Sequence, residues 1–521
     1  MKVPHLIALL AFGCNMPDGG LSSLEEATWD PNNVVVAGGG LYVLLPGAGA
    51  IVRLEPGEDP VRIELDEGRV TRIAGSPDGN RMVAFVERYR CESDNADEIK
   101  RVDTLDECPQ DALIVETELT VIEGTTPKPP LPVSGTYNSI AFSDDGSFAI
   151  AYVDFSQQIE VDGVLNLTGV AVVDLDAGIT SPVPVGFAAD RVLFSNDDGG
   201  APTEAVVLSR SAVAVIDLLA DQPDVEVTFP LTLDPDQTVE PTSVDLTPDG
   251  RYALISTVGS SDLYVLDLEQ HAINIVELSA VPAELAVSDA YDRSVLVYQT
   301  QEVVELLDHQ FFEVETFDLD EAMNHVALSG DNALLYGTDG QHDLYRLDLE
   351  DEDVIEYRLQ NPAVSLHVSP DNAFALALTR AEGGFGDGVD ALYDQNPGLE
   401  ILDLQSDESD AFILEGQGLD VKYANDETSL SALILQEGID YVYALDLYTG
   451  QATEVELSTP PIAIGSMPDG SFFITHDSPL GLVSFLDPNA ADGPEITDEI
   501  GGFASIGLFD EIEIAVEGGE E

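Results

Sequence analysis

The sequence predicts an all-β fold, a β-propeller built from about ten repeat units of four short antiparallel strands. One phrase recurs along the chain, often at intervals of 40 to 42 residues: an apolar strand, Ser or Thr, a Pro-Asp-Gly-like turn and a second apolar strand. A further apolar run follows each phrase, ends in Leu-Asp or a close variant, and leads into a fourth apolar segment. Four short strands per unit, with turn signals between them, are typical of a propeller blade.

The first and second strands of each unit are predicted from nine copies of the turn phrase. These copies begin at residues 75, 142, 194, 246, 287, 328, 368, 424 and 467. Alternating Val, Ile, Leu, Tyr and Phe suit pleated strands. In Pro248-Asp249-Gly250, proline presets the turn and glycine supplies the positive φ.

The third strand of each unit is predicted from the run that ends in aspartate. A residue that recurs in every blade favours a strand cap or a turn over a catalytic role. The aspartates are Asp174, Asp217, Asp267, Asp348, Asp403 and Asp446.

The number of units raises a question of architecture, because propellers usually have four to eight blades. The first unit, 34–66, lacks a clear innermost strand, and we expect the C-terminal segment 502–509 to supply it and close the ring. About ten units form either one large ring or two packed rings, divided near 230–240.

The repeat resembles the bacterial WD40-like and TolB-like propeller repeats across most of residues 34–510. The resemblance rests on Ser76-Pro77-Asp78-Gly79, Thr247-Pro248-Asp249-Gly250 and Ser369-Pro370-Asp371-Asn372. It implies the propeller fold and a surface protein, and it specifies no activity.

The N-terminus reads as an export signal. Lys2 precedes a short apolar core, and residues 10–14 (Leu-Ala-Phe-Gly-Cys) resemble the bacterial lipoprotein signal, which implies lipidation of Cys14. We expect a lipoprotein-type signal at 1–14, a polar tether at 15–33 and an acidic tail at 511–521. This predicts an exported protein, lipid-anchored at a bacterial cell envelope, on its periplasmic or outer surface. A signal without lipidation is the alternative.

The charge balance limits the choice of partners. Nineteen Lys and Arg face 99 Asp and Glu, a formal net charge of −80. Such a surface repels nucleic acid and favours cations, basic partners and a salty medium. The acidity reflects either a solvated surface adapted to salt or dedicated cation binding.

Two cysteines lie within one polar stretch. Cys91 and Cys108 are 17 positions apart, and in an exported protein a disulfide between them would contribute roughly 3 kcal/mol. The alternative is two unrelated thiols.

Candidate binding residues fall in the predicted first strands and in one inserted loop. Asp245, His367 and Lys422 share one repeat position, where other units have alanine, and are predicted to line the central channel. The loop 383–398 carries Asp387, Asp390 and Asp394, whose oxygens suit Ca²⁺. Ordinary hydrogen-bonded polar residues and a solvated acidic loop are the alternatives.

The sequence favours a non-enzymatic binding or scaffold module, because it contains no P-loop, His-Glu-x-x-His or Gly-x-Ser-x-Gly motif. Three insertions, 88–111, 156–168 and 381–398, are the predicted surface for a protein partner or envelope component. The alternative is a metal-dependent, lactonase-like hydrolase with a cation in the central channel. A third candidate is a structural component of the envelope or spore coat.

Overall fold

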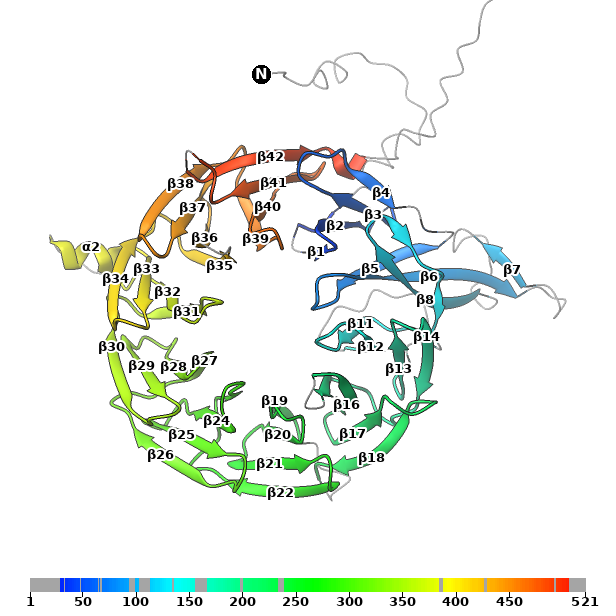
Figure 1. The fold of residues 1–521 in the computed structure, drawn as a ribbon, viewed down its shortest axis with the longest axis horizontal. Helices are drawn as coiled ribbons and strands as arrows, with labels where there is room; N and C mark the ends of the chain where they lie inside the picture. The colour runs from blue at the N-terminus through cyan, green and yellow to red at the C-terminus, as the bar shows by residue number, and fades with distance from the viewer. Residues whose placement is uncertain are drawn as a thin grey trace, which may run out of the picture.

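The computed structural model describes residues 29–505, apart from 32, 47, 64, 66–67, 93–98, 103–112, 134, 155–165, 197–199, 233–238, 384–387, 426–428 and 492. Ten antiparallel sheets follow one another around a single ring, each contributing one blade (Figure 1). The predicted propeller of four-stranded units is therefore confirmed. The two-ring alternative is wrong, because the sheets on either side of 230–240 are neighbouring blades that share a hydrophobic cluster.

The first five blades follow in chain order, each with its innermost strand first. Blade 1 contains β1 (Val34–Ala37), β2 (Gly40–Leu45), β3 (Ala50–Leu54) and β4 (Val61–Ile63). Blade 2 contains β5 (Arg69–Gly75), β6 (Met82–Glu92), β8 (Leu113–Glu123) and β10 (Leu131–Pro132), with β7 (Ile99–Val102) beside β6 and β9 (Thr126–Pro127) beside β8. Blade 3 contains β11 (Ser139–Phe142), β12 (Phe148–Tyr152), β13 (Val170–Asp174) and β14 (Ile179–Val183). Blade 4 contains β15 (Arg191–Asn196), β16 (Pro202–Leu208), β17 (Ala212–Asp217) and β18 (Asp224–Pro230). Blade 5 contains β19 (Pro241–Leu246), β20 (Tyr252–Thr257), β21 (Asp262–Asp267) and β22 (Ala272–Glu277).

The other five blades complete the ring in the same way. Blade 6 contains β23 (Glu284–Val287), β24 (Arg293–Val297), β25 (Val303–Asp308) and β26 (Val314–Asp318). Blade 7 contains β27 (His325–Ser329), β28 (Asn332–Tyr336), β29 (Asp343–Asp348) and β30 (Val354–Arg358). Blade 8 contains β31 (Ala363–Val368), β32 (Phe374–Thr379), β33 (Gly398–Asp403) and β34 (Glu408–Ile413), with the helix α2 (Val389–Gln395) between β32 and β33. Blade 9 contains β35 (Gly418–Asn425), β36 (Leu430–Gln436), β37 (Tyr441–Asp446) and β38 (Gln451–Glu456). Blade 10 contains β39 (Pro461–Ser466), β40 (Phe472–His476), β41 (Leu482–Asp487) and β42 (Glu495–Gly501), followed by the 3-10 helix η3 (Phe503–Ser505).

The repeated turn phrase forms a hydrogen-bonded corner between the first two strands. In blade 5 the Thr247 hydroxyl donates to Asp249 Oδ1 at 2.5 Å, and the same oxygen accepts the N–H of Arg251 at 3.0 Å. Gly250 adopts a φ of +66°, as the turn requires. The aspartate that ends a third strand caps its own turn, since Asp348 Oδ1 accepts the N–H groups of Glu350 at 2.9 Å and Asp351 at 2.8 Å. Both predicted turn roles are confirmed.

The core is divided into ten hydrophobic clusters, one between each pair of neighbouring blades. One blade cannot bury both of its faces, whereas blades packed in a closed ring bury both. The cluster between blades 10 and 1 joins Leu41 and Val52 to Val483 and Phe485, so the ring is closed by the same apolar packing as elsewhere.

Closure of the ring differs from the expectation that residues 502–509 supply the innermost strand of blade 1. That strand is β1, which pairs with β2. The segment around Phe503 instead contacts the loop of blade 10, where the Ala504 N–H donates to Leu480 O at 3.0 Å. Trp29 packs edge-to-face on Phe503 at 5.1 Å and donates to Ser478 O at 2.6 Å. Val34–Ala37 occupy the innermost position of blade 1, and residues 506–509 of the expected closing strand lie outside the described residues.

Buried glutamates on the third strands of two blades form hydrogen bonds with the preceding blade. Glu305 in blade 6 accepts the N–H of Ser279, which follows the last strand of blade 5, at 3.2 Å. Glu400 in blade 8 accepts the N–H of Gln360, which follows the last strand of blade 7, at 2.5 Å. These side chains satisfy backbone donors where the chain passes from one blade to the next.

Candidate functional site: the insertion-bearing face and the channel wall

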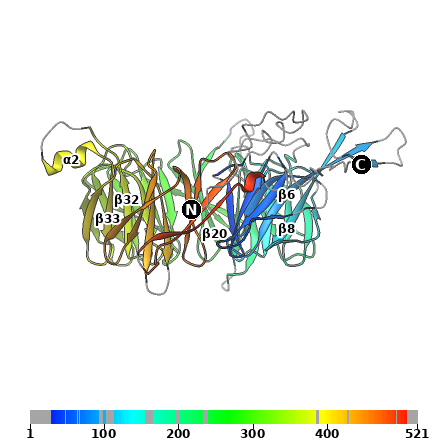
Figure 2. The ribbon, with the colours of Figure 1, turned by 90° about the horizontal axis from the view of Figure 1, so that it is seen from above.

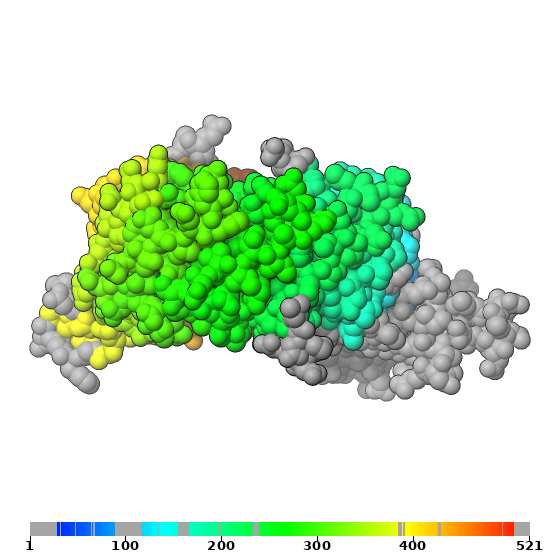
Figure 3. All heavy atoms as spheres, turned by 90° about the horizontal axis from the view of Figure 1, so that it is seen from below, coloured from blue at the N-terminus to red at the C-terminus, as the bar shows by residue number. Residues whose placement is uncertain are grey.

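All three predicted insertions connect strand ends that lie on one face of the ring. Each one connects the second and third strands of its blade: β6 to β8 in blade 2, β12 to β13 in blade 3, and β32 to β33 in blade 8. Because the strands alternate in direction, these connections all lie on the face opposite the Pro-Asp-Gly-like turns. We call this face the insertion face. Figure 2 shows α2 beyond the outer edge of the sheets, near one face of the ring, and Figure 3 shows the same yellow segment at the rim.

The predicted calcium loop contains a short helix that the sequence analysis did not anticipate. Asp390 and Asp394 lie in α2, and Asp387 lies outside the described residues. The backbone carbonyl of Asp394 accepts the N–H groups of Glu382 and Gly383, both at 2.9 Å, so the helix is tied back to the loop. Within the described residues there is no group of three His, Cys, Asp or Glu side chains that could hold a metal ion. Calcium binding at this loop stays a prediction.

The cysteine predictions fall largely outside the described part of the chain. Cys91 lies on β6, opposite Lys100 on β7 and Leu113 on β8. Cys108 and Cys14 are outside the described residues. Within those residues, no helix is long and apolar enough to cross a bilayer.

The three channel candidates lie on innermost strands, and two of them meet. Lys422 on β35 is 3.0 Å from the Asp420 carboxylate. His367 on β31 accepts from or donates to the Ser365 hydroxyl at 3.0 Å. Burial lowers the pKa of His367, while Asp420 raises it and Lys422 lowers it, so these side chains interact across blades 8 and 9. Asp245 on β19 belongs to blade 5 and joins a different group.

Asp245 interacts with charged residues that the sequence analysis missed. Burial raises the pKa of Asp245, Arg191 on β15 lowers it, and Glu284 on β23 raises it. Glu284 in turn lies 3.0 Å from His325 Nδ1 on β27. Arg191, Glu284 and His325 share the repeat position two residues before that of Asp245. Comparing this second position between units would have revealed them.

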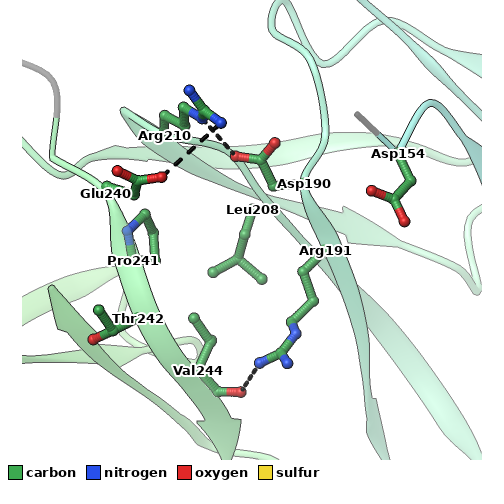
Figure 4. A pocket seen from close by; sticks show the side chains of 9 residues that line it. All are labelled: Asp154, Asp190, Arg191, Leu208, Arg210, Glu240, Pro241, Thr242 and Val244. Atoms are coloured by element: carbon green, nitrogen blue, oxygen red, sulfur yellow. Dashed lines mark hydrogen bonds and ion pairs between the residues drawn. The ribbon is translucent and has the colours of Figure 1, made fainter. Parts of the chain in front are cut away.

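Two hollows meet beside Arg191 at the insertion face. The first, about 310 Å³, lies between blades 3, 4 and 5 and is lined by Asp154, Asp190, Arg191, Leu208, Arg210, Glu240, Pro241, Thr242 and Val244 (Figure 4). We call it the Arg191–Arg210 hollow. The second, about 530 Å³, continues along the innermost strands past Asp245 and Glu284, where Ala283 and Ala286 leave space.

Charges of both signs line the Arg191–Arg210 hollow. In Figure 4, Arg210 lies with Asp190 and Glu240 along one side, and Arg191 lies on the other. Arg210 is 3.8 Å from Asp190 and 4.0 Å from Glu240, and Arg191 donates to Val244 O at 3.1 Å. Burial raises the pKa of Asp190, Arg210 lowers it, and the nearby carboxylates raise it.

A buried pairing of serine and histidine in blade 10 resembles a nucleophile and its base but is inaccessible. Ser484 Oγ lies 2.8 Å from His476 Nε2, and His476 Nδ1 lies 2.9 Å from Thr459 O. Both side chains are 0 % exposed, so no substrate can reach them. This pair satisfies buried polar atoms and stabilises the blade.

Comparisons with known proteins give a fold likeness and no family. No protein-family model matches the chain, and no curated protein matches it. Among solved structures, dihydro-heme d1 dehydrogenase NirN in complex with DHE is 15% identical over 60% of this chain and 68% of its own, with a TM-score of 0.38. Hydrazine synthase of Kuenenia stuttgartiensis is 14% identical over 49% and 80%, with a TM-score of 0.32. A eukaryotic initiation factor is 9% identical over 81% and 96%, with a TM-score of 0.48. At these values the similarities carry no argument about function.

Proposed function

We propose that this propeller is an exported binding or scaffold protein, anchored through a lipid on Cys14 to a bacterial cell envelope, and that it holds a protein partner or envelope component on its insertion face. The resemblance of the repeats to WD40-like and TolB-like propellers and the lipoprotein-type signal support the location. The observation that carries the proposal is the shared position of the three insertions. Loops that vary in length on a rigid scaffold commonly carry its binding function.

The electrostatics of the chain support a basic partner. A net charge of −80 attracts a positively charged surface and speeds its encounter, and it disfavours nucleic acid. The packed blades form a closed ring that holds the strand ends bearing the insertions in fixed relative positions. This arrangement suits a surface that engages one partner at several points.

The binding face can be tested by site-specific photo-crosslinking in cells. A photoreactive amino acid replaces Leu392, which is 53% exposed on α2, or Phe311, which is 67% exposed in a turn on the opposite face. We expect a discrete crosslinked species from position 392 and none from position 311. Equal crosslinking from both positions, or from neither, would contradict a partner on the insertion face.

The anchor is tested separately by labelling cells with a fatty-acid analogue. We expect the wild-type chain to take up the label and to fractionate with membranes, and the Cys14→Ser variant to do neither. An unlabelled wild-type chain would refute lipidation. It would not bear on the proposed binding face.

The metal-dependent hydrolase remains the alternative, and no specific observation favours it. A channel cation requires carboxylates from several blades to converge, whereas Asp245 and Glu284 interact with Arg191 and His325. A calcium titration at moderate salt, with magnesium as the control, addresses both the channel and the α2 loop. Saturable, calcium-selective binding would reopen this alternative.

A further inference from the structure

The Arg191–Arg210 hollow combines two arginines with three carboxylates in a space large enough for a small molecule. Pockets that hold small ligands start at about 300 Å³, and this one measures about 310 Å³. Only nineteen residues of the whole chain are basic, against 99 acidic residues. Two of those nineteen therefore border one hollow in a chain where cationic side chains are scarce.

Both guanidinium groups keep donors available for a ligand. A guanidinium has five N–H donors. The contacts from Arg210 to Asp190 and Glu240, at 3.8 and 4.0 Å, are too long to be hydrogen bonds. Arg191 uses one donor, for Val244 O. Within the described residues, these contacts leave most of the donors of both side chains without an acceptor.

Apolar side chains also contribute to the lining of the hollow. Leu208 lies between the arginines in Figure 4, and Pro241 forms part of the neighbouring wall. The hollow therefore offers donors for an anionic group, carboxylates for a cationic group, and an apolar surface between them.

We propose that this hollow binds a small zwitterion, an α-amino acid with an apolar side chain. Its carboxylate accepts hydrogen bonds from Arg191 and Arg210, its ammonium donates to Asp190 and Glu240, and its side chain lies over Leu208. Arg210 releases its loose ion pairs and gains charge-assisted hydrogen bonds in return. This inference goes beyond the proposed scaffold function and does not depend on it.

The net charge of the chain selects a ligand that is neutral overall. A simple anion is repelled by the field of the whole molecule. A simple cation lies beside both arginines and accepts no hydrogen bond from either. A zwitterion interacts with the charges that line the hollow. Its interaction with more distant charges is small, because its own two charges cancel and because salt screens charges beyond about 8 Å.

Calorimetric titration of the full chain with three probes of similar shape tests the proposal. The probes are L-leucine, L-leucinamide, which lacks the negative charge, and 4-methylpentanoate, which lacks the positive charge. We expect saturable binding of leucine and affinities at least about tenfold lower for the other two, the effect of losing one charge-assisted interaction.

Three variants locate the site. Arg191→Gln and Arg210→Gln should each weaken leucine binding at least about tenfold. Arg358→Gln is the matched control, because Arg358 pairs with Asp343 outside the hollow and its loss changes the net charge equally. Thermal melts verify that all three variants are folded. The proposal is overturned if leucine does not bind, if either analogue binds equally well, or if either variant of the hollow retains the wild-type affinity.

Discussion

Glu400→Gln should make this protein more stable at neutral pH, and the gain should disappear in acid. Glu400 lies on β33 and is 3 % exposed. Burial raises its pKa from 4.5 to about 7, although the N–H groups of Gln360 and Asn361 and the nearby His342 lower it. Burial disfavours the charged form, and in this case it outweighs the hydrogen bonds that favour that form.

The sign of the pH effect follows from proton uptake. Between pH 4.5 and about 7, the folded protein holds the Glu400 proton more tightly than the unfolded chain does. The contribution of this residue to stability is therefore complete below pH 4.5 and is lost as the pH rises through 7. A difference of 2.5 pKa units corresponds to about 3 kcal/mol, of which about 2.5 kcal/mol falls between pH 5 and pH 8.

Glutamine has nearly the same shape, remains neutral and keeps the oxygen that accepts the Gln360 N–H. Urea unfolding of the wild-type and variant proteins, followed by circular dichroism from about pH 5 to about pH 8, measures the difference in unfolding free energy at each pH. The self-repulsion of the acidic surface also changes with pH, but it is common to both proteins and cancels in this difference.

Glu408→Gln is the matched control, since Glu408 is exposed on β34 of the same blade. We expect its difference from the wild type to stay nearly constant across this pH range. If the Glu400→Gln difference is equally constant, Glu400 carries the same number of protons in both states, and the reasoning from burial is refuted.

Three further predictions concern the turns, the ring closure and the charge. Gly250→Ala should lower the unfolding free energy by about 3 kcal/mol, because its Cβ would lie 2.7 Å from Asn196 O of blade 4. Gly259→Ala, where no atom lies within reach of the new Cβ, should lower it by about 1 kcal/mol. Phe503→Ala should lower the unfolding free energy by about 3 kcal/mol in the same urea assay, because Phe503 is buried in the cluster between blades 10 and 1. Phe311→Ala, at an exposed position, should lower it by less than about 0.5 kcal/mol. Equal losses would show that η3 does not stabilise the ring closure. Raising sodium chloride from about 0.05 to about 0.5 M should raise the melting temperature, since salt screens a net charge of −80; an unchanged melting temperature would show that self-repulsion does not limit stability.

The architecture could be predicted from local patterns because each blade is a local structure. Residues 247–252 contain the hydroxyl, carboxylate and glycine that form their own turn, and the strands on either side pair with each other. The residues that form each turn therefore lie within a short stretch of sequence, and this stretch repeats along the chain. The turns, the strand content and the number of units therefore agree with the structure.

The ring closure could not be predicted in this way. Val34–Ala37 lacks the turn phrase of the other units, so the repeat pattern does not identify β1 and favours residues 502–509 in its place. The short Gly-Gly turn between β1 and β2 replaces the usual Pro-Asp-Gly, with Gly38 at a φ of +52° and Gly39 at +74°. The turn phrase that marks the first strand in nine units is therefore absent from the unit at 34–66, whose first strand only the structure reveals.

The amino-acid sequence alone is enough to predict the repeat, the turns, the net negative charge and the positions of the insertions in the chain, because each of these follows from residues close together in the chain or from composition. Only the packing of the blades shows that ten of them form one ring, that His367 interacts with Asp420 and Lys422, and that Asp245 interacts with Arg191 and Glu284. Those contacts join residues about 40 or more positions apart, and they depend on the angle at which each blade packs against the next. The Arg191–Arg210 hollow arises in the same way, from three blades whose separate sequences carry no sign of a shared cavity.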